Sequence, residues 1–202
     1  GENKVYCSEN KYKKYNIEVI DGTLYIKEED SRKIKINILN FIKYSVEVHL
    51  NKESLNNLNI QNDTGEIVIN KELRFQNIDI QNDTGDIKLF SNCDESIEIE
   101  SSTGDVELLG IDSTTSVHIK NDTGKIKIDS SHVGTIDIKT DTGNVDLSKV
   151  NCDSLSVKLS TGCTNLDSVI VVNNLDIKGS TGDVKLDGCD ALNINITLDT
   201  GS

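Results

Sequence analysis

The sequence predicts an all-β fold, a single-stranded parallel β-solenoid of about seven to eight coils with an N-terminal β cap. Eight Thr-Gly pairs recur at intervals of 19 or 20 residues, with Gly65, Gly85, Gly104, Gly124, Gly143, Gly162, Gly182 and Gly201 as their glycines. Apolar and polar residues alternate around nearly every pair, as in Ile78-x-Ile80 before Gly85. Such alternation is typical of strands with one wet face. No helical pattern accompanies it.

Each repeat is expected to contain a strand, a Thr-Gly corner, a second strand and a return segment that closes the coil. Glycine in the corner supplies a positive φ, and the preceding Asn, Asp or Ser can hydrogen-bond the turn backbone. The return segments carry apolar residues at Leu73, Cys93, Ile111, Val133, Val150, Val169 and Cys189. Three inward-facing stretches per coil favour a roughly three-sided coil, and a flattened, two-sided coil stays open.

Residues 1–50 do not carry the repeat, so we divide the chain into a cap at 1–50 and solenoid repeats at 51–202. The strands expected in the cap are residues 16–20, 23–27, 33–38 and 45–50, the first two joined by a tight Asp21-Gly22 turn. The end of a solenoid exposes unpaired backbone and apolar interior, and a different terminal element is expected to cover it.

Composition narrows the classes of function. Proline, methionine and tryptophan are absent and aromatic residues make up only 4% of the chain, which suits a narrow interior filled by Ile, Val and Leu. The net charge of -13 argues against nucleic acid and anionic lipid as partners, since both need a basic surface. No run of 18 apolar residues is present, so we expect no direct insertion into a membrane.

The reactive side chains do not form a recognisable catalytic motif, and we expect neither an enzyme nor a cofactor. His118 alternates with Val117 and Ile119, so it should face solvent, and His132 falls in a return segment one coil later. Cys93, Cys152 and Cys189 stand about three and two repeats apart. That separation exceeds the span of a disulfide, so we expect buried free thiols. Cys163, directly after a corner glycine, is expected to be an exposed thiol without a neighbouring base.

Acidic residues at the corners raise the question of calcium, and we expect no metal site. The candidates, if calcium did bind, are Asp63, Asp83, Asp122 and Asp141, with Glu66, Asp86, Asp105 and Asp183 beside them. Hard cations need several such oxygens. However, Ser replaces Asp at residues 102, 160 and 180, and Lys125 or Asn144 interrupts the second row. The glycine-rich nonapeptide of calcium-binding β-rolls is absent.

The order of these motifs resembles a known family. Gly22-Thr-Leu-Tyr-Ile is followed by Val46-Glu-Val-His-Leu, then by Leu58-Asn-Ile-Gln-Asn-Asp-Thr-Gly-Glu-Ile and further Thr-Gly units. This order is similar to the bacterial DUF4097 family of adhesin-like proteins with β-strand repeats. The resemblance implies a β-solenoid at the cell envelope of a low-GC Gram-positive bacterium. It supplies no binding residues, and Asn51 stands where a proline often follows in the family.

The function expected from these observations is a non-catalytic, extracytoplasmic surface module that binds an unknown protein or glycan. Free cysteines leave a cytoplasmic location open. One alternative is a structural protein that stacks end to end through an uncapped last repeat, where Ile194, Ile196 and Leu198 lie. A third is an enzyme of the polysaccharide-lyase kind, but the short, even returns leave no room for the walls of a cleft.

Overall fold

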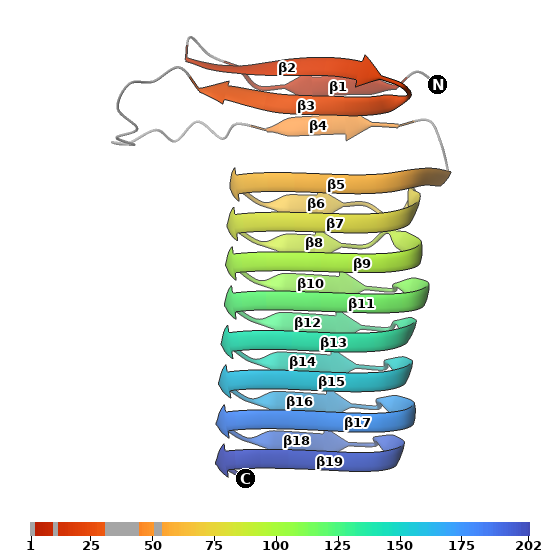
Figure 1. The fold of residues 1–202 in the computed structure, drawn as a ribbon, viewed down its shortest axis with the longest axis vertical. Helices are drawn as coiled ribbons and strands as arrows, with labels where there is room; N and C mark the ends of the chain where they lie inside the picture. Colours follow the sequence, from red (N-terminus) through yellow and green to blue (C-terminus); the bar gives the residue numbers. More distant parts are fainter. Residues whose placement is uncertain (1–2, 10–11, 31–44, 51–53) are drawn as a thin grey trace. The chain divides into compact units, whose positions relative to one another are not determined.

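The computed structural model describes residues 3–9, 12–30, 45–50 and 54–202 and divides the chain into two compact units, Gly1–Asn51 and Lys52–Ser202. All of its regular elements are strands (Figure 1). Within the described residues, no helix has the length and apolarity that a membrane crossing needs.

The first unit contains two antiparallel strand pairs. Its strands are β1 (Lys4–Cys7), β2 (Lys13–Ile20), β3 (Thr23–Asp30) and β4 (Val46–His49). The hairpin β2–β3 turns at Asp21 and Gly22, both with positive φ (49° and 78°), which confirms the Asp-Gly turn. β1 pairs with β4, inside the segment expected as the strand at 45–50. The strand expected at 33–38 lies outside the described residues.

The second unit is a parallel β-solenoid, as the sequence predicted. Eight long strands form one sheet: β5 (Ser54–Thr64), β7 (Arg74–Thr84), β9 (Asn92–Thr103), β11 (Asp112–Thr123), β13 (His132–Thr142), β15 (Asn151–Thr161), β17 (Ile170–Thr181) and β19 (Asp190–Thr200). Seven short strands form the other: β6 (Ile67–Ile69), β8 (Ile87–Leu89), β10 (Val106–Leu109), β12 (Ile126–Asp129), β14 (Val145–Ser148), β16 (Thr164–Asp167) and β18 (Val184–Asp187). Each strand pairs with its counterpart in the next coil, so the two sheets stack along one axis (Figure 1).

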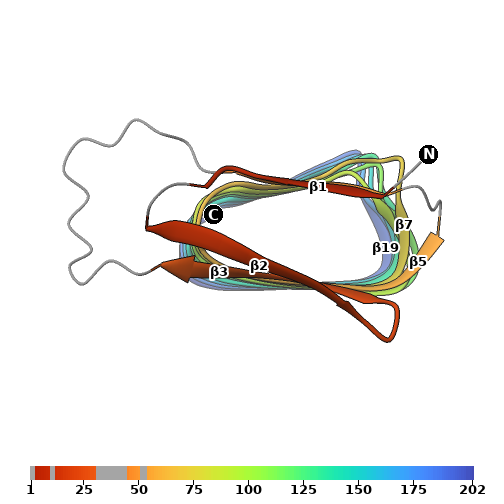
Figure 2. The ribbon, with the colours of Figure 1, turned by 90° about the horizontal axis from the view of Figure 1, so that it is seen from above.

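The return segment is not a separate side of the coil. It forms the first residues of each long strand, which then bends into the stretch that leads to the corner, so a coil has two sheets and a flattened outline (Figure 2). A bulge marks this bend in several pairs, as between Phe75 and Asn77 of β7. β9 carries one residue more than β7, yet Thr84 still pairs with Thr103. A bulge therefore absorbs the extra residue of the longer strand without shifting the corner.

The core consists of ranks of aliphatic side chains, one residue per coil, between the two sheets. Examples are Ile78, Ile97, Val117, Ile136 and Leu155, which pair in register and are at most 1% exposed. Burial of each such side chain stabilises the fold by about 1.5–3 kcal/mol, which makes this rank and its neighbours the main source of stability.

The apolar residues of the return segments fall into two ranks. Phe75, Cys93, Val133, Cys152 and Val171 are buried in the rank that pairs within the long strands, and Ile111, Val150 and Val169 are buried just before those strands begin. The described cysteines are free. Cys93 and Cys152 are buried as expected, whereas Cys189 is only half-buried because it lies beside the edge strand β19.

Candidate functional site

The Thr-Gly corners are built by contacts between successive coils. The amide of Gly65 donates to the carbonyl oxygen of Thr84 at 2.8 Å, and the same bond recurs at every following corner up to the bond from Gly182 to Thr200. The corner glycines have φ values between 125° and 150°. From Gly85 onward, a Cβ at each of these glycines would overlap the carbonyl oxygen of the glycine one coil earlier. The repeated motif is thus explained by the backbone of the corner.

The asparagine that begins several corners is hydrogen-bonded within the fold. Asn82 Nδ2 donates to the carbonyl oxygen of Gly85 at 2.8 Å, and Asn121 Nδ2 donates to that of Gly104 at 3.1 Å. Asn62 Nδ2 donates to Asn82 Oδ1 at 2.7 Å and so links two coils. These amides satisfy backbone carbonyls at the corner and do not face a ligand.

The four calcium candidates lie in one exposed outward row, one residue per coil. Asp63 and Asp83 occupy adjacent coils, and so do Asp122 and Asp141, but Ser102 separates the two pairs. The structure therefore brings them together only two at a time. Among the described residues, no group of three or more His, Cys, Asp or Glu side chains is arranged to hold a metal ion.

The second acidic row is occupied by hydrogen bonds to the backbone. Asp86 Oδ1 accepts the amide of Asp105 at 2.9 Å, and Asp105 Oδ1 accepts that of Lys125 at 2.8 Å. Asp183 Oδ1 accepts the amide of Ser202 at 3.0 Å in the same way. These three carboxylates each satisfy an amide of the next coil and so have a structural role at the corner, whereas Glu66 forms an ion pair with Lys88 at 2.6 Å.

The positions that interrupt this row are explained by the same geometry. Asn144 Oδ1 takes the place of a carboxylate and accepts the amide of Cys163 at 2.9 Å. Lys125 instead forms an ion pair with Asp146. Cys163 is half-buried rather than exposed.

The histidines of the solenoid do not meet. His118 Nδ1 lies 3.9 Å from Asp137 Oδ2, and His132 Nδ1 lies 3.7 Å from Asp112 Oδ1. His118 pairs in register with Asp137, and His132 with Asp112, so the two rings occupy different ranks of the long-strand sheet. Both are solvent-exposed, as the alternation predicted for His118.

A feature that the sequence analysis missed is a row of four lysines on the outer face of the long-strand sheet. We call Lys120, Lys139, Lys158 and Lys178 the lysine row. They pair in register on β11, β13, β15 and β17, and each precedes its corner glycine by four residues. That constant offset was visible in the sequence, but reading each strand by its alternation classed the lysines only as outward-facing.

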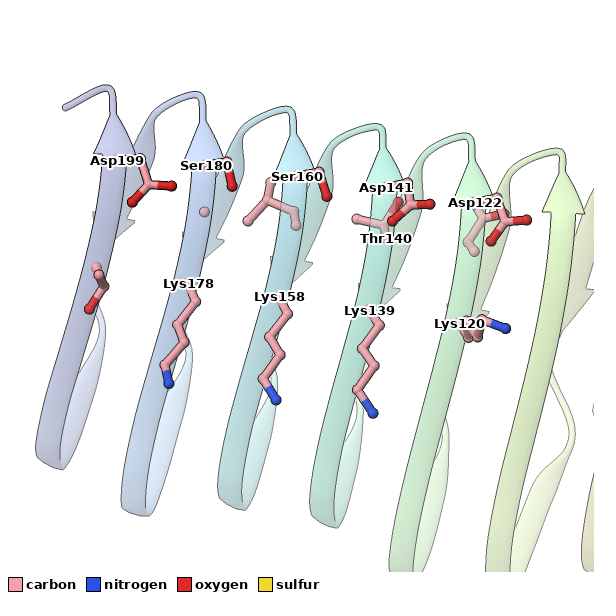
Figure 3. A pocket seen from close by; sticks show the side chains of 14 residues that line it. Lys120, Asp122, Lys139, Thr140, Asp141, Lys158, Ser160, Lys178, Ser180 and Asp199 are labelled. Carbon is pink, nitrogen blue, oxygen red and sulfur yellow. The ribbon is translucent and has the colours of Figure 1, made fainter.

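The lysine row borders an open depression of about 520 Å³. Its other side is the outward corner row, with Asp122, Asp141, Ser160, Ser180 and Asp199 (Figure 3). Between the two rows lie Asn121, Thr140, Leu159 and Gly179, of which the first three are buried and Gly179 is half-buried. These four residues form the floor of the depression between the two exposed rows.

Comparison with known proteins places the chain in a family. The family model described as Toastrack DUF4097 matches residues 3–167. No curated protein and no solved structure matches the chain. The repeats of the solenoid continue beyond the matched segment, since β17 and β19 pair in register with the strands before them. On the match across most of its length, the chain belongs to the DUF4097 (Toastrack) family.

Proposed function

We propose that this Toastrack solenoid is a non-catalytic module that binds a protein or glycan at the cell envelope through the outer face of its long strands. The proposal rests on the arrangement of polar and charged side chains on this outer face. It presents in-register rows of polar and charged side chains over eight strands, with a run of four like charges in the lysine row. Such a face offers a repeated pattern to an extended partner.

The interior supports a binding role rather than a catalytic one. It is a continuous aliphatic core, and the depression on the outer face is open and shallow. His118 and His132 are both exposed and lie in separate ranks, and each faces a carboxylate rather than a nucleophile. Enzymes that act on polymers need a walled cleft with an acid and a base in reach of one another.

Binding to the envelope is tested directly with purified cell-wall material. The folded protein is expected to sediment with cell-wall fractions or to bind defined glycans on an array, and the heat-denatured protein is expected not to. Retention by one fraction identifies the partner class. If the folded protein binds neither wall fractions nor arrayed glycans or surface proteins, the proposal is wrong.

A second candidate function is assembly of the solenoids end to end. β19 is the edge of the long-strand sheet, and Leu192, Ile194 and Ile196 are 74%, 50% and 42% exposed on it. An edge strand with exposed apolar residues is a template for pairing with another strand, here one from a second copy. Light scattering over a concentration series is expected to show growing assemblies that Ile194→Lys abolishes. A strict monomer at every concentration contradicts this candidate.

A further inference from the structure

We infer that the lysine row is a binding site for a linear acidic glycan that carries one carboxylate on each sugar. This inference rests on the proposed surface-binding function and narrows it to one face and one ligand class. Three properties of the row support it: its spacing, its only partly neutralised charge and the chemistry of the side chains around it.

The spacing of the row is set by the sheet. Because the four lysines occupy successive in-register strands, their Cα atoms repeat at the distance between neighbouring strands, about 4.8 Å. Lys139, Lys158 and Lys178 extend in parallel away from the corners, whereas Lys120 turns its amino group to the other side (Figure 3). The first three therefore present ammonium groups in a line along the solenoid axis. A pyranose ring in a linear chain covers a similar length, so a glycan whose successive rings turn the same face to the sheet presents one carboxylate to each ammonium group.

The charge on this part of the face is only partly neutralised. Lys139 Nζ forms an ion pair with Asp137 Oδ2 at 3.2 Å. On the coil of Lys158 serine replaces the carboxylate in both neighbouring rows, at Ser156 and Ser160. On the coil of Lys178, Ser180 stands in the row of Asp141, whereas Asp176 stands in the row of Asp137. Within the part of the chain that the structure describes, neither Lys158 nor Lys178 has a carboxylate oxygen within 4.0 Å.

Like charges on neighbouring strands destabilise a sheet, because the side chains repel one another across the pair. Lys158 and Lys178 are direct neighbours in the register of β15 and β17. An anion that lies between them removes this repulsion and gains two charge-assisted contacts. The pair is thus a local anion site in a chain whose net charge is -13.

The same geometry disfavours an acidic peptide. Successive side chains of an extended peptide point to opposite faces, so the acids on one face repeat at about 6.8 Å, which is twice the rise per residue. That period does not match lysines about 4.8 Å apart. When one acidic side chain of such a peptide lies opposite a lysine, the next acidic side chain does not lie opposite the neighbouring lysine.

Single-stranded nucleic acid is disfavoured by the residues around the row. Its sequence-tolerant binding relies on aromatic side chains on which bases stack. None of the residues that line the depression is aromatic; apart from Leu159 and Gly179, they carry hydroxyl, amide, carboxylate or ammonium groups. Ser160, Ser180 and Thr197 offer hydroxyl groups beside the ammonium groups, a combination that suits a sugar with both hydroxyls and a carboxylate.

The test measures binding of oligogalacturonides of two to six residues by isothermal titration calorimetry at low and at physiological ionic strength. The variant Lys139→Gln/Lys158→Gln/Lys178→Gln is compared with Lys71→Gln/Lys149→Gln/Lys185→Gln, which has the same net charge and whose lysines are exposed and lie outside the row. Circular dichroism melting checks that both variants fold. The methyl-esterified hexamer, a thymidine oligonucleotide and polyglutamate serve as comparison ligands.

We expect the row variant to bind the acidic hexamer at least about tenfold more weakly than the control variant, since three charged contacts of modest strength together give that factor. The affinity of the unmodified protein should rise with each sugar up to the trimer, which matches the three lysines in line, and then level off, and salt should weaken it. The esterified hexamer should not bind. Equal affinity of the two variants, or tighter binding of the oligonucleotide or of polyglutamate, overturns the inference.

Failure of this inference is distinguishable from failure of the proposed function. If the row variant still sediments with cell-wall material as the unmodified protein does, another part of the surface binds, and only the lysine row is excluded. If the unmodified protein binds no wall fraction and no arrayed ligand, the proposed function itself fails.

Discussion

The carbonyl oxygen of Gly65 occupies the space that a Cβ atom on Gly85 would need. Gly85 also has a φ of 125°, which other residues rarely adopt, so two independent constraints act on one position. The amide of Gly85 in turn donates to Thr103 of the following coil at 2.8 Å. Backbone therefore packs directly on backbone along the corners, and the Thr-Gly repeat follows from the way one coil sits on the next.

Thr164 interrupts an aliphatic rank of the short-strand sheet. It pairs in register with Val145 and Val184, is fully buried, and its Oγ1 has no hydrogen-bond partner among the described residues. Thr164→Val keeps the shape and removes the unsatisfied hydroxyl, so we expect a gain of about 1 kcal/mol in the free energy of unfolding. Chemical denaturation measures it, with the exposed Thr135→Val as control. A loss of stability in Thr164→Val contradicts the prediction.

Two isoleucines of one rank differ in burial because of their place along the solenoid. Ile136 is 0% exposed and Ile194, on the edge strand, is 50% exposed. We expect Ile136→Ala to lower the free energy of unfolding by about 2–5 kcal/mol, as for other fully buried aliphatic residues. Ile194→Ala is expected to lower it by less than about 1 kcal/mol, since little buried area is lost. Equal losses in urea denaturation would show that the edge strand is covered in solution.

Buried thiols should make the solenoid sensitive to high pH. Burial raises the pKa of Cys152 to about 12 and also raises that of Cys93. In the unfolded chain these thiols ionise near their ordinary pKa of 9.0. The protonated form is thus favoured in the folded state, and its contribution to stability is complete below pH 9.0 and is lost as the pH rises toward about 12.

The measurement is the midpoint of urea denaturation at several pH values for the unmodified protein and for Cys93→Val/Cys152→Val. Valine suits the site because Val133 and Val171 are the direct neighbours of Cys152 in its rank. Above pH 9.0 we expect the variant to lose less stability than the unmodified protein as the pH rises. Below pH 9.0 we expect the stability of the two proteins to change with pH in the same way. Parallel curves over the whole range would show that the thiols do not contribute.

Calcium is expected to leave the stability of the protein unchanged. The corner carboxylates of Asp63, Asp83, Asp122 and Asp141 approach one another only in pairs, and calcium needs about six to eight oxygen ligands. Asp86 and Asp105 already accept backbone amides. The melting temperature is therefore predicted to stay constant on addition of millimolar calcium, with magnesium as the control for general ionic effects. A rise with calcium alone, lost in Asp122→Asn/Asp141→Asn, contradicts this prediction.

Much of the fold could be predicted from the sequence because the backbone of every corner requires a glycine, and the Thr-Gly period therefore marks each coil. The alternation around each pair predicted that Ile78, Ile80 and Val117 face inward, and the structure has them in the core. The bent long strand could not be predicted in the same way. Its bulge absorbs the residue by which β9 exceeds β7, so residues that look out of phase in the sequence, such as Phe75 and Cys93, face each other in the fold.

The candidate site was harder to predict because it depends on residues from four coils. Alternation assigns Lys158 and Lys178 to the outer face one strand at a time, and their proximity follows only when the coils are aligned on Gly162 and Gly182. The charge balance around them depends on further rows of the same sheet. Conversely, the acidic residues at the corners could be interpreted from the sequence as metal ligands. In the structure, Asp86 and Asp105 accept backbone amides of the next coil instead.

The most direct measurement of the central claim compares Gly65→Ala with Gly85→Ala. The two glycines lie in adjacent coils with φ values of 142° and 125°, but a Cβ on Gly65 meets only Asn62 Nδ2 at 3.6 Å, an ordinary contact. We expect Gly65→Ala to lower the free energy of unfolding by about 1–2 kcal/mol through backbone strain alone. Gly85→Ala should lower it by at least about 2 kcal/mol more, because its Cβ also forces the coils apart. Equal losses in the two variants would contradict the claim that direct packing of coil on coil imposes the Thr-Gly repeat.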